Sequence, residues 1–525
     1  MIIPLSKTEK VNFRNPHICA LDPKMVPLDH VLTNLFLQIS NKGLPVKIGP
    51  FKKKHDMPTL MERMKMLEEK GLIHGVSGNL DAVEDWLRSN LVSMVFRGNV
   101  IKEKVSSLQP MHLMSYRIQN KSNNRDYNAS DQVYMMLKTA PEVLEGLRAY
   151  LARGWDSNVS KINSNEPLDV DTAGILMLIA DIKEKPQART KIENVKPLLK
   201  RQTEIFCDDM RRLLVYQDIL PRTVFIDYFR ILIGFHLAIY EMNLIWKLPK
   251  MRAKGTTEVD DDWTMVVDLT DDLDSSVAPY ACKDMETLAN ALNRYFKTTF
   301  EITAVQKKRE ARTPDDAGVE SCLNELANTL DHKAEYYALK MEGIIAAACK
   351  DEETKEAIQQ MLQYFEPDDF FGRYIHLLEN ASGGSNYQYK YHLQCLDSLG
   401  MKNSESMLLA SGVRSRRHPR RGALGSKLLE TLVQLLVLEE AGNGQYLSKP
   451  LSIEELADKI RERYGLIING IKEPRYANAD VETHAAFREN MEAFKNKLRQ
   501  IGFYSDLSDS CILQKIQPRY KIIDE

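Results

Sequence analysis

Residues 222–248 read RTVFIDYFRILIGFHLAIYEMNLIWKL and form the longest apolar stretch with a helical pattern in this sequence. Apolar side chains recur along it with helical periodicity, and Arg230, His236 and Glu241 interrupt them. A helix that is apolar on nearly every side must be covered, and ionisable residues favour cover by protein over lipid. We therefore expect a buried core helix in which His236 is a hydrogen-bonded core histidine rather than a ligand.

Helical patterns also lie on both sides of this stretch. VKPLLKRQTEIFCDDMRRLLVYQDIL precedes it at 195–220, and METLANALNRYF follows it from Met285. Between the two, WTMVVDLTDDLDSS at 263–276 contains one short apolar strand. The sequence therefore predicts a mainly α fold, with a multi-domain helical body, a short central β element and a C-terminal winged-helix-like module.

The size of the chain, 525 residues, indicates several domains, since one domain commonly takes roughly 100 to 200 residues. Hydrophobic residues make up 43% and charged residues 27%, as in ordinary globular proteins. Polar, turn-forming stretches then suggest the boundaries. We expect an N-terminal helical or winged-helix domain at 1–120, a helical core domain at 121–255, an α-rich domain at 256–400, a basic arm at 401–424 and the winged-helix-like module at 425–525.

The N-terminal region predicts a helix over 29–40 and a second helix from Thr59 that Gly71 ends before a strand. Its first residues lack the apolar run of a secretion signal, so we expect a cytoplasmic protein without membrane contact. The seven cysteines stand singly, without a C-x-x-C pair, which argues against a zinc ribbon or a disulfide framework.

A carboxylate cluster follows the central strand. Asp268, Asp271, Asp272 and Asp274 are candidate Mg²⁺ ligands, because hard cations prefer several carboxylate oxygens. The same residue type also forms turns and caps helices, and no histidine or lysine at a suitable spacing completes a catalytic site. A Mg²⁺-dependent nuclease is therefore an alternative here, and the sequence predicts no metal site or catalytic residue.

A basic segment, residues 411–427, reads SGVRSRRHPRRGALGSK and contains no carboxylate. Guanidinium groups stay charged and pair with phosphates through two parallel hydrogen bonds. Because the net charge of the whole chain is −2, contact with a polyanion must come from such a local patch. The segment can equally be a solvated linker or pair with the protein's own acidic surface. Its candidate DNA-binding residues are Arg414, Arg416, Arg417, Arg420, Arg421 and Lys427.

The C-terminal module begins with SKLLETLVQLLVLEE from Ser426, an amphipathic helix. A second helix follows the capping box formed by Ser452 and Glu455 and ends at Gly465. The third helix is expected over 480–501, and the tail alternates apolar and polar residues like a two-stranded wing. Three helices and a ribbon in this order are typical of a winged helix, whose third helix can enter the major groove.

The third helix of this module has a mixed charge. Arg488, Lys495 and Arg499 are its candidate DNA contacts, whereas Glu482, Glu489 and Glu492 on the same helix would repel DNA over part of the surface. Residues 411–525 contain 19 basic and 16 acidic residues, so the excess is small. Winged helices also serve as protein docking modules, and that alternative stays open.

These C-terminal motifs, RSRRHPRRGALGSKLLETLVQLLVL, LADKIRERYGL and LRQIGFYSDLSDSCILQKIQPRY, resemble components of bacterial methylation-associated defence systems. More loosely, they resemble accessory proteins of phosphorothioation-linked restriction systems. The resemblance implies a non-motor subunit that works beside a modification methyltransferase and a DNA-dependent ATPase. No family catalytic residue can be matched to this sequence.

The sequence itself agrees with an accessory role. It contains no G-x-x-x-x-G-K-[ST] loop, no G-x-G-x-x-G after a strand and no G-x-S-x-G elbow, so no cofactor is predicted. We expect an accessory subunit that binds duplex DNA through its phosphate backbone in a multi-protein anti-phage system. A scaffold that docks other subunits without touching DNA, the nuclease described above and a transcriptional regulator are the alternatives.

Overall fold

The computed structural model describes residues 3, 5, 14–44, 46–48, 55–96, 103–156, 161–163, 166–180, 182, 184–186, 195–312, 317–348, 352–381, 385–412, 419–441, 445–504, 515–516 and 518–522. Helices make up most of this structure and the strands are short. The predicted mainly α fold is confirmed, while the predicted domain boundaries stay predictions.

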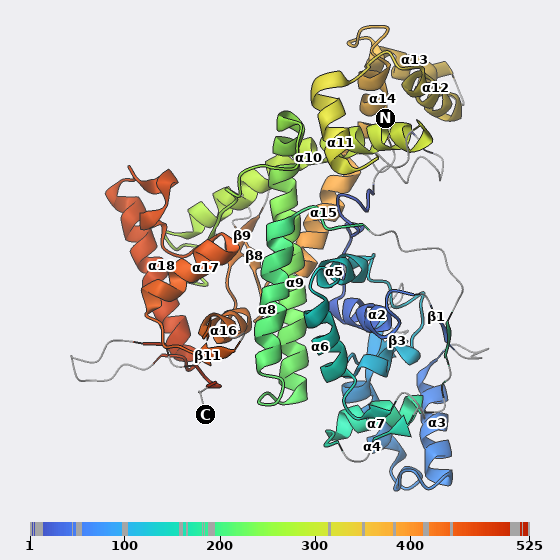
Figure 1. Ribbon diagram of the computed structural model, residues 1–525, viewed down its shortest axis with the longest axis vertical. Coiled ribbons are helices and arrows are strands. Elements are labelled where there is room, and N and C mark those ends of the chain that lie inside the picture. The colour runs from blue at the N-terminus through green and yellow to red at the C-terminus, as the bar shows by residue number, and fades with distance from the viewer. Residues whose placement is uncertain are drawn as a thin grey trace.

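Three long helices form the spine of the molecule: α8 (Lys200–Val215), α9 (Arg222–Lys254) and α10 (Ala278–Arg312). Both α8 and α10 pack on α9, and Figure 1 shows α8 beside α9 at the centre. The helix α9 is long and apolar enough to cross a membrane, but 78% of its most apolar window is buried inside the protein. It is therefore the predicted core helix. Gly255, with φ +76°, ends it in the left-handed conformation that glycine adopts readily.

The N-terminal part packs on one side of this spine (Figure 1). Its helices α2 (Leu28–Ser40), α5 (Ala129–Leu137) and α6 (Pro141–Leu151) contact α8 or α9. The second predicted helix is α3 (Met57–Glu69), and Gly71 follows it with φ +68°. The prediction of a strand directly after Gly71 was wrong. Turns and bends follow Gly71 and lead to the helix α4 (Leu80–Trp86). This part also contains the helix α7 (Val170–Ile179) and three pairs of short strands. The pairs are β2 (Val92–Phe96) with β3 (Glu103–Leu108), β4 (Trp155–Asp156) with β5 (Lys161–Ile162), and β1 (Val46–Ile48) with β6 (Glu184–Pro186).

A four-stranded sheet joins the middle of the chain to its end. The strand order is β12 (Leu466–Ile467), β7 (Met265–Asp268), β9 (Arg420–Ala423) and β8 (Leu409–Ser411). The first three strands are parallel, and β8 is antiparallel to β9. The predicted central strand is β7, and all four of its residues are buried under cover that includes α10. The strands β7 and β9 approach so closely that a Cβ at Gly422 would lie 2.5 Å from the Val266 carbonyl oxygen.

The three predicted C-terminal helices are present as α16 (Ser426–Leu436), α17 (Ile453–Tyr464) and α18 (Val481–Gln500). The predicted capping box of α17 is confirmed, with the Glu455 backbone N–H donating to the Ser452 hydroxyl and the Ser452 N–H donating to the Glu455 carboxylate. The winged-helix arrangement is not confirmed. The ribbon β10 (Leu438–Glu440) with β11 (Tyr446–Ser448) lies between α16 and α17, and most of the predicted wing, 505–514, is outside the described residues.

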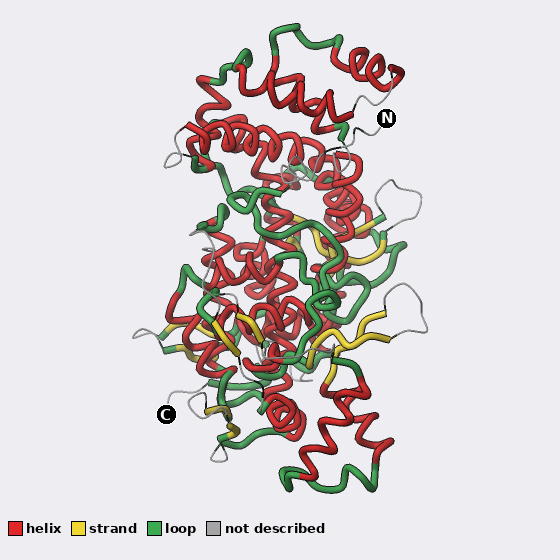
Figure 2. Tube along the Cα trace, turned by 90° about the vertical axis from the view of Figure 1, so that its right-hand side faces the viewer, coloured by secondary structure: helices red, strands yellow, loops and turns green. Residues whose placement is uncertain are grey.

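A helical subdomain projects from one end of the molecule (Figures 1 and 2). It contains α11 (Val319–Asn324), α12 (Glu335–Ala348), α13 (Glu352–Leu362) and α14 (Phe370–Glu379). Ring contacts of Tyr337 with Phe371 and Tyr374 hold α12 against α14. The chain then returns to the spine through α15 (Ser385–Leu399), which packs on α9 and α10.

A buried polar contact ties the N-terminal segment to α9. The Cys19 thiol donates a hydrogen bond to Glu241 Oε1 over 3.1 Å, and the Glu241 side chain is only 3% exposed. Burial raises the pKa of Glu241 to about 7, since the charged form loses its hydration and the Cys19 hydrogen bond offsets little of this loss. Glu241 therefore makes the stability of the fold depend on pH.

We expect Glu241→Gln to stabilise the protein relative to the wild type above pH 7 and to have a smaller effect below pH 4.5. Between these values the unfolded chain releases a proton that the folded chain retains, so the wild type loses up to about 3 kcal/mol as the pH rises. Glutamine does not titrate and can still accept the Cys19 hydrogen bond. Urea unfolding of both proteins at pH 5 and pH 8 measures the effect, and an equal difference at both pH values would contradict it.

Candidate nucleic-acid interface and a polar cavity

The described parts of the basic segment on either side of residues 413–418 lie in the strands β8 and β9 and next to them. β8 and β9 pair from Leu409 opposite Gly422 to Ser411 opposite Arg420, and the Gly412 N–H donates to the Pro419 carbonyl over 2.9 Å. Residues 413–418, which include Arg414, Arg416 and Arg417, lie outside the described residues. The described ends of the segment are thus fixed in a sheet that packs on the core.

The other two arginines of the segment are bound inside the protein. Arg420 donates two hydrogen bonds to the Asp397 carboxylate, at 2.7 and 2.8 Å. The Arg421 side chain, 5% exposed, lies with Nε 2.9 Å from Asp268 Oδ2 and also donates to the Ser411 carbonyl. Both guanidinium groups therefore stabilise the hairpin. Lys427 is half exposed, with Nζ 3.7 Å from Glu405 and 4.0 Å from Asp227.

The carboxylate cluster after β7 also has partners in the protein. Asp268 is fully buried. In addition to its ion pair with Arg421, it accepts hydrogen bonds from the backbone N–H and the hydroxyl of Thr270. Asp271, with φ +59°, pairs with the buried Lys497 at 2.9 Å. Asp272 accepts from the backbone N–H of Asp274, and both residues are exposed. Within the described ranges, no group of three or more His, Cys, Asp or Glu side chains is arranged to hold a metal ion.

The basic and acidic features lie at opposite edges of the sheet. β7 and β9 are parallel, with Asp268 opposite Ala423. The acidic turn leaves the carboxyl ends of these strands, whereas Pro419 enters β9 at its amino end. The described acidic turn and the ends of the undescribed segment 413–418 are therefore separated by the length of the strands.

The helix α18 packs one face on the carboxyl edge of this sheet. The Asn490 amide donates to the Val267 and Ile468 carbonyls and accepts from the Leu269 N–H, while Lys497 donates to the Leu424 carbonyl. Of the predicted DNA contacts on this helix, Arg488 is exposed. Lys495 and Arg499 both lie over the Tyr504 ring, with their cationic groups 5.6 and 5.9 Å from its centroid. The face of α18 on the sheet is therefore unavailable to a DNA groove.

A buried cluster centred on Asp209 links the spine to α17. Asp209 is fully buried and accepts hydrogen bonds from His236 Nε2 at 2.9 Å, the Tyr464 hydroxyl at 2.7 Å and the Arg463 guanidinium at 2.6 and 3.0 Å. His236 is thus a hydrogen-bonded core histidine, as predicted. Burial alone would raise the pKa of Asp209, but Arg463 and the hydrogen bonds of His236 and Tyr464 outweigh it and lower the pKa. The charged carboxylate is therefore the stable form at neutral pH.

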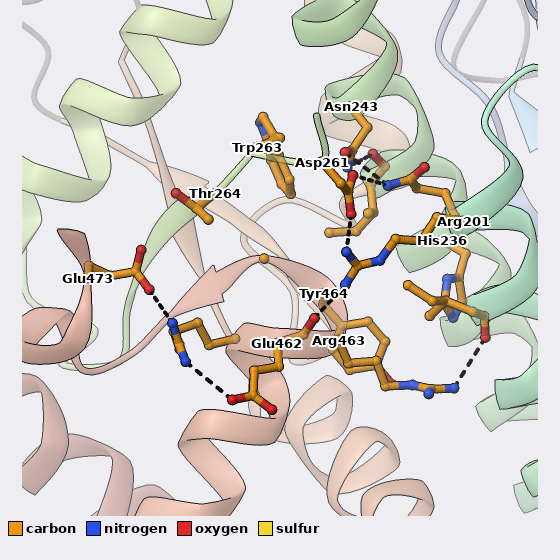
Figure 3. A pocket seen from close by; sticks show the side chains of 15 residues that line it. Arg201, His236, Asn243, Asp261, Trp263, Thr264, Glu462, Arg463, Tyr464 and Glu473 are labelled. Carbon is orange, nitrogen blue, oxygen red and sulfur yellow. Dashed lines mark hydrogen bonds and ion pairs between the residues drawn. The ribbon is translucent and has the colours of Figure 1, made fainter. Parts of the chain in front are cut away.

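The Asp209 cluster borders a polar cavity of about 200 Å³, shown in Figure 3. Side chains from α8, α9, α17 and the segment before β7 converge on it. Arg201 Nη1 lies 2.5 Å from Asp261 Oδ2, and Arg461 Nη1 lies 2.8 Å from Glu473 Oε1. The cavity is lined by Arg201, Gln202, Ile205, His236, Ile239, Asn243, Asp261, Trp263, Thr264, Arg461, Glu462, Arg463, Tyr464, Gly465 and Glu473.

A comparison with protein families matches residues 8–520 to the family described as methylation-associated defense system protein MAD7. The chain belongs to this family. The resemblance inferred from the C-terminal motifs is thereby confirmed over almost the whole length of this family member. No curated protein and no solved structure shows significant similarity to it.

Sequence reasoning missed the Asp209 cluster and the cavity of this family member. The two partners of the strongest pair, Asp209 and Arg463, are 254 positions apart, and each stands among other charged residues of an amphipathic helix. No spacing rule connects residues so distant. The sequence did show ionisable residues within an apolar stretch. This pattern pointed to His236 as a buried histidine but did not indicate that Asp209 is its partner.

Proposed function

We propose that this member of the methylation-associated defence family is an accessory subunit that binds duplex DNA through its phosphate backbone. The observation that supports this proposal most is that the arginines of the basic segment fall into two groups. Arg420 and Arg421 pair with carboxylates of the protein and fix the strands. The remaining arginines, Arg414, Arg416 and Arg417, come from the connection between two anchored ends.

Anchoring of the hairpin favours phosphate binding for two reasons. A segment held at both ends in a sheet loses less conformational entropy on binding than a free tail does. The acidic turn at 268–274 leaves the opposite edge of the sheet, and two of its carboxylates pair with Arg421 and Lys497. These carboxylates therefore compete little with DNA for the three remaining arginines.

The surface of α18 is a secondary contact in this proposal. Arg488, Lys495 and Arg499 lie near Glu489 and Glu492 on the same helix, so its outer face is close to neutral. Such a face positions a duplex weakly, without the electrostatic affinity of the hairpin. In the defence system we propose a methyltransferase and an ATPase as partner subunits, which supply the chemistry for which this sequence lacks motifs.

We expect Arg414→Ser, Arg416→Ser and Arg417→Ser together to abolish most duplex binding without changing thermal stability. Three phosphate contacts correspond to about a 40-fold loss of affinity between 50 and 200 mM salt, and the triple variant loses this dependence. Fluorescence anisotropy with a labelled duplex measures the affinity. Arg488→Ser is the matched control, because it removes one exposed arginine from α18 and should weaken binding by severalfold at most.

A scaffold function is the second candidate, and the projecting helical subdomain favours it. Residues 331–379 contain eleven Asp and Glu against five Lys and Arg, a composition that repels DNA and suits a basic protein partner. Wild-type protein that shows no duplex binding at 50 mM salt, yet retains other subunits after nuclease treatment, would replace the DNA proposal with this one.

A further inference from the structure

The polar cavity lies at the amino edge of the sheet. Trp263 and Thr264 directly precede β7, and Gly465 precedes β12, with the Met265 N–H donating to the Gly465 carbonyl. Pro419 enters β9 at this same edge. The cavity is therefore at the end of the sheet where Pro419 enters β9, and opposite the acidic turn.

The charged side chains in the cavity wall are already paired with one another, which favours an uncharged ligand. Arg201 pairs with Asp261, Arg461 with Glu473, and Arg463 with Asp208 and Asp209. An anionic ligand would have to break one of these pairs and leave a carboxylate without its cation, which is costly in a partly buried site. The wall therefore favours a neutral molecule over a free phosphate or carboxylate.

The same cavity wall also offers a hydrogen-bond donor and an acceptor to a ligand. His236 commits Nε2 to Asp209, so Nδ1 is the ring nitrogen left for a ligand. Gln202 uses its amide N–H groups on Asn243 and Asp261, which leaves its carbonyl oxygen as an acceptor. Arg461 Nε is a buried donor without a partner among the described residues. The ligand must therefore present donors and acceptors together, as heterocyclic bases do.

An aromatic wall adds a preference for a planar ligand. Trp263 is 7% exposed and lines the cavity, and in Figure 3 it lies above Tyr464 in the view. Gly465 lies close beside Trp263, because a Cβ there would come within 2.7 Å of the Trp263 carbonyl oxygen and within 3.2 Å of ring carbon Cε3. A base that enters the cavity can therefore stack on this indole, and such stacking adds to affinity for any base because every base has a π face.

We propose that this cavity binds a single neutral nucleobase. The base belongs either to a free nucleoside or to a nucleotide turned out of duplex DNA. The volume of about 200 Å³ is small for a drug-sized ligand and suits one ring system. This inference goes beyond the proposed function, because phosphate binding by the hairpin carries no information about bases.

The test is isothermal titration of the full chain with adenosine, guanosine, cytidine and thymidine, which lack phosphate. At least one nucleoside should bind with a Kd below about 1 mM. Thr264→Phe, which fills the cavity without removing a hydrogen bond seen in the structure, should weaken that binding at least about 10-fold, a change of about 1.4 kcal/mol. Thr287→Phe, on the exposed surface of α10, is the matched control and should bind like the wild type.

Quenching of Trp263 fluorescence gives a second measurement that does not depend on the folding of Thr264→Phe. A bound nucleoside should quench wild-type protein and a Trp246→Phe variant alike, since Trp246 does not line the cavity. Absence of binding by all four nucleosides, or binding that Thr264→Phe leaves unchanged, would overturn the proposal.

A duplex containing 2-aminopurine distinguishes the two sources of the base. A rise in its fluorescence with wild-type protein but not with Thr264→Phe shows a base turned out of DNA, whereas nucleoside binding without this rise shows a free ligand; both support the site. The nucleoside titration needs no DNA contact, so the variant lacking Arg414, Arg416 and Arg417 should bind nucleosides normally. A failure of the DNA proposal is therefore separable from a failure of this one.

Discussion

Asp209→Asn should lower the free energy of unfolding by about 3 kcal/mol, because it removes the charge from a buried, fully paired carboxylate. Asp209 is fully buried and receives donors from three side chains on α9 and α17. Asparagine keeps the shape but removes the charge, so the guanidinium of Arg463 keeps only Asp208 as its anion. Urea unfolding at pH 7 measures the loss.

The control for this experiment is Asp218→Asn. Asp218 pairs with Arg153 on the surface, and its side chain is 69% exposed, so its removal should cost less than about 0.5 kcal/mol. The pKa of Asp209 is depressed, hence its contribution is present above the usual carboxyl pKa and is lost as the pH falls through the folded value. The difference between wild type and Asp209→Asn should therefore shrink in acid, and a constant difference would contradict the account.

Arg421→Ser should destabilise the protein by about 3 to 5 kcal/mol, because it leaves Asp268 buried without its cation. Thr270 would still donate two hydrogen bonds to Asp268, but no positive charge would balance it. The thermal unfolding midpoint should fall by several degrees. Arg488→Ser, an exposed arginine on α18, should stay within about 0.5 kcal/mol of the wild type.

The double variant Arg421→Leu with Asp268→Leu tests the cause of this loss. If the cost comes from an unpaired buried charge, removing both partners should recover a large part of the stability. A double variant less stable than either single one would instead assign the effect to packing. The same result affects the design of DNA-binding experiments. A variant lacking all five arginines of the basic segment would lose DNA binding through unfolding as well as through lost phosphate contacts.

The sequence predicted those features that depend on local patterns. The apolar period of 222–248 became α9, the apolar run before Asp268 became β7, and the Ser452–Glu455 capping box begins α17. Each is decided within a few residues by side-chain period, burial or a local hydrogen bond. The strand expected after Gly71 failed, because a glycine in the left-handed conformation ends a helix without determining the type of the next element.

Contacts between residues that are far apart in the sequence could not be predicted from local patterns. Arg420 and Arg421 looked equivalent to Arg416 and Arg417, and only the pairing of β9 with β7 and β8 shows that they meet Asp397 and Asp268. The parallel pairing of β7 and β9 spans more than 150 residues, including the whole helical subdomain. The partners of the acidic cluster were hidden for the same reason, since Arg421 and Lys497 come much later in the sequence.

The salt dependence of duplex binding shows whether Arg414, Arg416 and Arg417 contact phosphates. We predict that the logarithm of the association constant falls with the logarithm of salt concentration with a slope of about −3 for the wild type, because three arginines meet phosphates. The slope should approach zero when Arg414, Arg416 and Arg417 are replaced by serine. Equal slopes for the two proteins would contradict the account and remove the hairpin from any role in DNA binding.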